Sequence, residues 1–182
     1  MSGIITNNIG ITSGLKKVIP AGGNTPMFYA RRGAIGCSGD GCSQNLSDNT
    51  FTKAEMNGEF LDTDSCYDTS TYRFTPNKAG KYFLFAKLFM GEHQDRGINF
   101  EIEFRFNGNQ FKMTGMQYEG DFQSDGYDKE RDYHTAIQAV KEFNGTSDYV
   151  ELWARVDQSS SYARIWGAGQ SYHGSYWGGF KI

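Results

Sequence analysis

The chain has 182 residues, which is enough for one domain with its own core. Hydrophobic residues make up 38% of it, and 11 Tyr, 14 Phe and 3 Trp make that share unusually aromatic. A net charge of −3 at pH 7 gives no broad basic face, so we expect no nucleic acid as the main partner. We find no apolar run typical of a signal peptide, so we expect folding in a cytosol.

Residues 1–25 differ from the rest because they are rich in Gly and lack aromatic side chains. They contain β-branched residues but no run that could bury a face, so we predict an extended arm that gains order by lying on another surface. The alternative is a frayed terminus without a partner. The residues that we expect to anchor the arm are Ile4, Ile5, Asn7, Asn8, Ile9 and Leu15.

The chain from residue 26 onward alternates short apolar segments with turn residues. Met27–Arg31 predicts a first strand, and the Gly-, Ser- and Asp-rich residues 33–49 predict a loop. Residues 62–70 predict a second loop, which is followed by a short strand and a tight turn at 76–80. Residues 81–89 are apolar and aromatic, so we expect them to form the central strand, although they are too few to span a membrane.

A strict period of two marks the next strand. Its apolar residues share one face and are Ile98, Phe100, Ile102, Phe104 and Phe106. Glu101 and Glu103 therefore fall on the opposite face, which we predict to be solvated. Asn107-Gly108 is a type I′ hairpin dipeptide, and Asn144-Gly145 predicts another turn. With the strands expected at 149–156, 165–166 and 175–182, about eight to ten strands predict an all-β antiparallel sandwich.

Several short motifs resemble, in their order, the C1q-like globular domain, a family of jelly-roll trimers related to tumour necrosis factor. Its signature is similar to Tyr67-Asp68, to Tyr72-Arg73-Phe74-Thr75-Pro76 and to Gly80-Lys81-Tyr82-Phe83-Leu84-Phe85. Its opening strand, hairpin and closing strand are similar to residues 28–31, 107–108 and 175–182. Tyr72 stands where the family usually has Gly.

This resemblance implies a C1q/TNF-like jelly roll over residues 26–182 that forms a homotrimer, with aromatic residues of one sheet packed about the three-fold axis. It also implies a short strand at residues 51–55. Residues 135–143 could pass for a short helix by their pattern, but the resembling fold implies a strand there.

The leader of residues 1–25 resembles the N-termini of virion surface proteins of tailed bacteriophages. We therefore expect a non-enzymatic virion structural protein, made in the host cytoplasm and exposed on the virion surface. It would be a trimeric knob or capsid decoration protein whose arm docks onto capsid or tail proteins, without membrane insertion. The alternatives are a tail-fibre-type adhesin for a host glycan or protein, a soluble C1q-like lectin and, third, an enzyme acting on glycan.

Aromatic residues among Gly, Ser, Asp and Gln are typical of recognition surfaces, and several of them would suit a trimer interface equally well. Those expected to bind a partner are Tyr118, Phe122, Tyr127, Tyr133 and Tyr172. Catalysis is not expected, because no G-x-S-x-G elbow is present and we interpret His93, His134 and His173 as solvated.

Residues 121–132 resemble a calcium loop, with Gly126 at the sixth place. Oxygen ligands at the first, third, fifth and twelfth places would be Asp121, Gln123, Asp125 and Asp132. Because Gln123 and the short Asp132 depart from the pattern, we interpret the segment as a solvated acidic loop and expect no cofactor, with calcium as the alternative.

Three cysteines cannot all pair with one another. Cys37 and Cys42 flank a short Gly-rich loop that could close into a small ring after release from the cell, and Cys66 stands alone. In a reducing cytosol we expect all three to be free thiols. Zinc is not expected, because the Cys and His residues lack paired ligand spacing.

Overall fold

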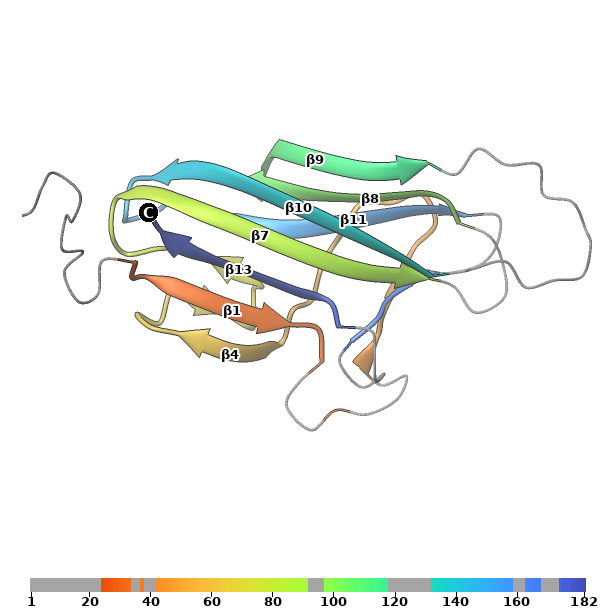
Figure 1. Ribbon diagram of the computed structural model, residues 1–182, viewed down its shortest axis with the longest axis horizontal. Helices are drawn as coiled ribbons and strands as arrows, with labels where there is room; N and C mark the ends of the chain where they lie inside the picture. Colours follow the sequence, from red (N-terminus) through yellow and green to blue (C-terminus); the bar gives the residue numbers. More distant parts are fainter. Residues whose placement is uncertain are drawn as a thin grey trace, which may run out of the picture.

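The computed structural model describes residues 24–33, 37, 42–91, 97–117, 132–158, 163–167 and 174–182. Within them the chain forms thirteen β-strands and no α-helix (Figure 1). The eight strands of five or more residues are β1 (Met27–Arg31), β4 (Gly58–Asp62), β7 (Gly80–Gly91), β8 (Gly97–Phe106), β9 (Asn109–Gln117), β10 (Asp132–Phe143), β11 (Val150–Gln158) and β13 (Tyr176–Lys181). The short strands are β2 (Gln44–Leu46), β3 (Thr52–Lys53), β5 (Tyr67–Asp68), β6 (Arg73–Phe74) and β12 (Ala163–Ile165).

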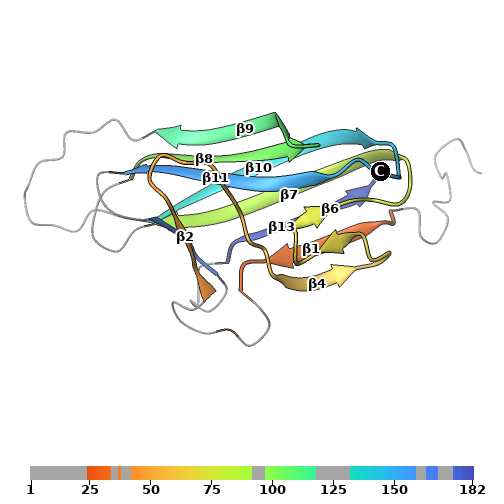
Figure 2. The ribbon, with the colours of Figure 1, turned by 180° about the vertical axis from the view of Figure 1, so that it is seen from behind.

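These strands form two antiparallel sheets. The seven-stranded sheet has the order β2-β12-β7-β13-β1-β4, and β10 pairs with β7 along its whole length. The six-stranded sheet has the order β5-β6-β11-β8-β9, and β3 also pairs with β11. Figure 1 views the seven-stranded sheet, with β7, β13 and β1 in front, and Figure 2 views the molecule from behind, with β8 and β11 in front. The all-β sandwich predicted from the sequence is confirmed.

The core lies between the two sheets and combines aromatic rings with aliphatic side chains. Alternation along β7 buries every second residue from Tyr82 to Met90, and the opposing sheet buries Phe100, Ile102 and Phe104, as their period of two predicts. Trp177 is completely buried, and its ring meets that of Phe28 edge-on at 4.7 Å. Large rings and smaller aliphatic side chains therefore fill the space between the sheets together.

The predicted turns are present, with the backbone conformations that their residues favour. Asn107 and Gly108 both have positive φ, at 50° and 81°, as a type I′ hairpin requires. The side-chain oxygen of Asn144 accepts hydrogen bonds from three following backbone N–H groups, and Gly145 has φ 75°. A Cβ at Gly145 would lie 2.2 Å from the backbone nitrogen of Ala79, so only glycine fits there.

The sequence interpretation misses three strands, of which β5 lies within the loop predicted at residues 62–70. β2 lies within the segment predicted as a loop and is a strand because it pairs with β12. The Gln44 amide also joins β2 to residues 53–55, because its Nε2 donates to the Lys53 carbonyl and its Oε1 accepts from Glu55 N–H. β4 was not predicted because three of its five residues are exposed in succession, which hides any alternation. Residues 52–53 and 135–143, in contrast, form strands as the resemblance implied.

The cysteine prediction is wrong for one pair. Cys37 and Cys42 are joined by a disulfide bond, whereas Cys66 is a free, buried thiol. The chain brings the pair together because Gly33 turns with φ 90° and packs directly against both cysteines. Burial raises the pKa of the Cys66 thiol, so this cysteine is neutral and unreactive.

Candidate functional site

The outward face of the seven-stranded sheet carries a continuous group of six aromatic rings, which we call the aromatic face. Its members come from β1, β4, β7 and β13 and are Tyr29, Phe60, Phe83, Phe85, Tyr176 and Phe180. Neighbouring ring centroids in this group lie between 5.6 and 6.5 Å apart. All six rings remain partly or largely exposed to solvent.

Strand alternation and pairing register place these rings together. The outward residues of β7 include Phe83 and Phe85 between Lys81 and Lys87, and the direct neighbours of the two rings on β13 are Phe180 and Gly178. Gly178 in turn pairs with Tyr29 on β1. A Cβ at Gly178 would lie 2.7 Å from the Phe85 ring, so the absence of a side chain lets this ring lie flat over the sheet.

The aromatic face continues as apolar surface to both edges of its sheet. Phe60 and Leu61 on β4 are 49% and 43% exposed at one edge, and Val140 on β10 is 53% exposed at the other. Soluble monomers rarely expose a contiguous apolar surface of this extent unless it contacts a partner. The aromatic face is therefore the strongest candidate for an interaction surface among the described residues.

The polar groups within this face are phenols and the exposed amide of Gln138 beside Phe85, and the cations Arg31 and Lys87 lie beside Phe60 and Tyr176. Burial raises the pKa of the Tyr29 phenol, and the neighbouring Tyr176 raises it further. Arg31 lowers the pKa by less, so the pKa of Tyr29 lies above its ordinary value. The phenol thus stays protonated at neutral pH. The guanidinium of Arg31 lies 4.2 Å above the Phe60 ring. Such a surface suits a neutral, largely apolar partner.

The outward face of the six-stranded sheet is different because charges cover it. Glu151 is 2% exposed and accepts hydrogen bonds from Lys53 Nζ at 2.6 Å, Arg73 Nε at 2.7 Å and Trp153 Nε1 at 3.0 Å. Burial raises the pKa of this carboxyl, but the three donors together outweigh it and hold the pKa below its usual value. This face neutralises its own charges and offers no apolar surface comparable to the aromatic face.

The prediction that Glu101 and Glu103 lie on a solvated face is wrong for Glu103. Both do lie opposite the buried phenylalanines, but Glu103 is only 1% exposed. The guanidinium of Arg105 pairs with the Glu103 carboxylate and stacks 3.9 Å above the Trp153 ring. The side chains of Arg105 and Trp153 therefore cover Glu103. Glu101 is partly exposed and is bonded to Arg155.

Most site residues predicted from the sequence lie outside the described residues, and their roles stay predictions. These are the arm residues Ile4, Ile5, Asn7, Asn8, Ile9 and Leu15, the aromatic residues Tyr118, Phe122, Tyr127 and Tyr172, and the calcium candidates Asp121, Gln123 and Asp125. Asp132 and Tyr133 begin β10, but their side chains are not described. His134 is exposed and its ring lies 4.6 Å from that of Phe89.

Among the described residues no group of three or more His, Cys, Asp or Glu side chains could hold a metal ion. In the same part of the chain, no helix is long and apolar enough to cross a membrane. The resemblance implied aromatic residues on one sheet at a trimer axis, but the sequence reasoning did not identify the six residues of the aromatic face. Residues 81–89 carry rings at both odd and even positions, which is the signal that two faces of this strand are buried or bound.

The fold and the aromatic face together define an all-β jelly roll of the C1q/TNF-like type. Its similarity to solved structures bears this out. The TNF protein Eiger from S. frugiperda aligns with a TM-score of 0.55 at 9% identity, over 86% of this chain and 93% of that one. Murine APRIL at pH 5.0 aligns with a TM-score of 0.55 at 10% identity, over 86% and 99%, and its pH 8.5 structure with 0.51.

At such low identity the similarity shows the fold alone. No family model matches the sequence, and a search of curated proteins finds no match either.

Proposed function

We propose that this chain is a non-enzymatic assembly protein that forms a homotrimer through its aromatic face. The observation that carries this proposal is the contiguous apolar surface from Phe60 and Leu61 to Val140, which no described part of the chain covers. Association would remove these rings from water, at roughly 25 cal/mol for each Å² of apolar surface buried. The face presents rings and neutral phenols, which are suited to packing rather than to general acid–base chemistry.

A three-fold arrangement is supported by two features. The apolar surface reaches both edges of one sheet, so the β4 edge of one copy can meet the β10 edge of the next, as a closed ring of identical subunits requires. The motifs shared with the C1q-like family, whose members are trimers, favour three copies over other ring sizes.

The finer proposal is that this trimer is a virion surface protein of a tailed bacteriophage, either a knob or a capsid decoration protein, docked through residues 1–25. The resemblance of the leader supports this role. Lys181 N–H donates to the Pro26 carbonyl, so the arm leaves the domain beside the C-terminus. The end of β9 and the start of β10, between which Tyr118, Phe122 and Tyr127 lie in the sequence, are at the opposite end (Figure 1). Anchoring and host contact would thus occupy opposite ends.

The assembly is tested by placing a charge in the aromatic face. Phe85→Lys should convert a trimer of the 20.4-kDa chain into monomers in native mass spectrometry, because a buried unpaired charge is strongly unfavourable. Met113→Lys is the matched control: Met113 is 43% exposed but lies on β9 of the other sheet, so this variant should remain trimeric. A trimeric Phe85→Lys variant would contradict the proposed interface.

Docking is tested separately. The full chain should be retained on virions or capsids stripped of this protein, whereas a version lacking residues 1–25 should be lost although it still forms trimers. Equal retention of both would refute the anchoring role. Retention of neither, together with binding of host glycan by both, would favour the soluble lectin alternative.

A further inference from the structure

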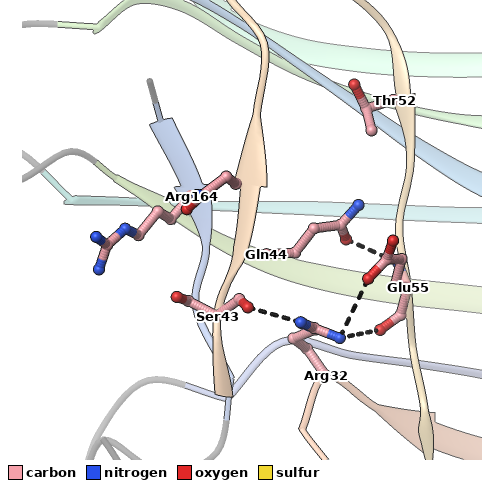
Figure 3. A pocket seen from close by; sticks show the side chains of 7 residues that line it. Arg32, Ser43, Gln44, Thr52, Glu55 and Arg164 are labelled. Atoms are coloured by element: carbon pink, nitrogen blue, oxygen red, sulfur yellow. Dashed lines mark hydrogen bonds and ion pairs between the residues drawn. The ribbon is translucent and has the colours of Figure 1, made fainter. Parts of the chain in front are cut away.

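Two adjoining hollows lie away from the aromatic face, where β2 runs beside residues 52–55. Their volumes are about 570 Å³ and about 410 Å³, and Thr52 and Glu55 line both of them. Figure 3 shows Arg32 and Gln44 pointing into the space between these two segments, whereas Arg164 points away from Glu55. The two hollows adjoin at Thr52 and Glu55, and we call them together the Tyr72 groove after the only aromatic residue in their lining.

A buried guanidinium fixes the centre of the Tyr72 groove. Arg32 is 8% exposed, and its two terminal nitrogens donate to the carbonyls of Glu55 at 3.0 Å and Ser43 at 2.6 Å. The same side chain lies 3.6 Å from a carboxylate oxygen of Glu55, whose side chain remains 45% exposed. Glu55 thus offers a fixed acceptor to a ligand, and the exposed amide of Asn45 lines the same hollow.

Cations border the second hollow. The side chains of Lys53 and Arg73 line it and are 26% and 39% exposed, although both bond to the buried Glu151. Arg32 and Arg164 line the first hollow, so the groove has four cations in its lining against the carboxylates of Glu55 and the adjacent Glu151. This local excess of positive charge contrasts with the net charge of −3 for the whole chain.

Tyr72 occupies the groove in a backbone conformation that costs free energy. Its φ is 56°, in the left-handed region that glycine adopts without penalty and a bulky side chain does not. Four hydrogen bonds from Ser70 and Thr71 to the carboxylate of Asp68 hold the turn in place. The partly exposed Tyr72 side chain lines the second hollow together with Lys53 and Arg73. A strained aromatic side chain at a hollow indicates a functional role.

We propose that the Tyr72 groove binds an acidic saccharide. The C–H face of a sugar ring would pack on Tyr72, and its hydroxyls would donate to Glu55 and pair with Asn45 and Thr52. A carboxylate or sulfate on the sugar would bind Lys53 and Arg73. The exposed Glu55 carboxylate disfavours a bare anion, so the ligand must combine hydroxyl donors with an acidic group. One copy of the chain supplies the whole groove, so this binding does not depend on the proposed assembly.

The test compares three sugar oligomers of equal length by calorimetric titration of the full chain: a galacturonate, a sulfated galactan and a neutral galactan. At least one acidic oligomer should bind, at least about tenfold more tightly than the neutral one. The acidic oligomer that binds identifies the acid as carboxylate or sulfate. Failure of both to bind, or equal binding of the neutral oligomer, would overturn the proposal.

Two glycine variants test the role of Tyr72. Tyr72→Gly should weaken acidic-oligomer binding about tenfold without lowering the unfolding temperature, because glycine relieves the backbone strain. Ser65→Gly, at φ 53° outside the groove, should relieve similar strain and leave binding unchanged. Unchanged binding by Tyr72→Gly, or a lowered unfolding temperature, would refute a binding role for Tyr72. Native mass spectrometry of Tyr72→Gly separates loss of binding from loss of assembly.

Discussion

Replacing the buried carboxylate Glu151 by glutamine tests how the charged face of the six-stranded sheet contributes to stability. The side chain is 2% exposed and accepts three hydrogen bonds, two of them from cations. Charge-assisted hydrogen bonds contribute roughly 1.5–3 kcal/mol each. Lys53 and Arg73 are 26% and 39% exposed, so solvent partly replaces the bonds they lose to Glu151. We therefore expect the substitution to lower the free energy of unfolding by about 3 kcal/mol, less than the sum of the three bonds. For a chain of this length that lowers the unfolding temperature by roughly 6–12 °C.

The assay is thermal unfolding followed by circular dichroism, with Glu101→Gln as the control. Glu101 pairs with a single cation and is partly exposed, so its loss should cost about 1 kcal/mol. The pKa of Glu151 is lowered on folding from its ordinary value of 4.5, so its stabilisation is present above pH 4.5 and is lost as pH falls through the folded value. The difference in the free energy of unfolding between wild type and Glu151→Gln should therefore become smaller in acid. A difference that does not change with pH, or one below 1 kcal/mol at pH 7, would contradict a stabilising role for the Glu151 carboxylate.

Two further changes test the turns and the core by chemical denaturation. Gly145→Ala should cost about 3 kcal/mol, because the new Cβ would lie 2.2 Å from the Ala79 backbone at φ 75°. Gly108→Ala, at φ 81° with its nearest neighbour 3.6 Å away, should cost only about 1 kcal/mol, and equal losses would contradict this account. Trp177→Ala should cost about 4 kcal/mol because the ring is completely buried, and a loss below 1 kcal/mol would show that the core does not depend on it.

Local patterns predicted the parts of the fold that local rules determine. The alternation around Phe100, Ile102 and Phe104 fixed a face of β8, and the two Asn-Gly pairs fixed turns, because each depends on neighbouring residues only. β2 could not be predicted in this way, since it pairs with β12, which is distant from it in the sequence. The Cys37–Cys42 disulfide was missed because the prediction rested on the cellular compartment rather than on the turn at Gly33.

The functional surfaces were harder to predict because they depend on tertiary contacts. Glu103 follows the alternation of a solvated residue, yet side chains from its own strand and from β11 cover it. The rings of the aromatic face come from four strands, and no spacing in the sequence shows that they touch. The resemblance flagged Tyr72 as a departure, but only its φ of 56° shows that the residue is strained.

The central claim is that the aromatic face is buried between identical copies. It is tested most directly by measuring the mass of the unmodified full chain in solution by analytical ultracentrifugation over a wide range of concentration. We predict a single species of three copies of the 20.4-kDa chain that persists on dilution. A species of one copy at all concentrations would contradict the account.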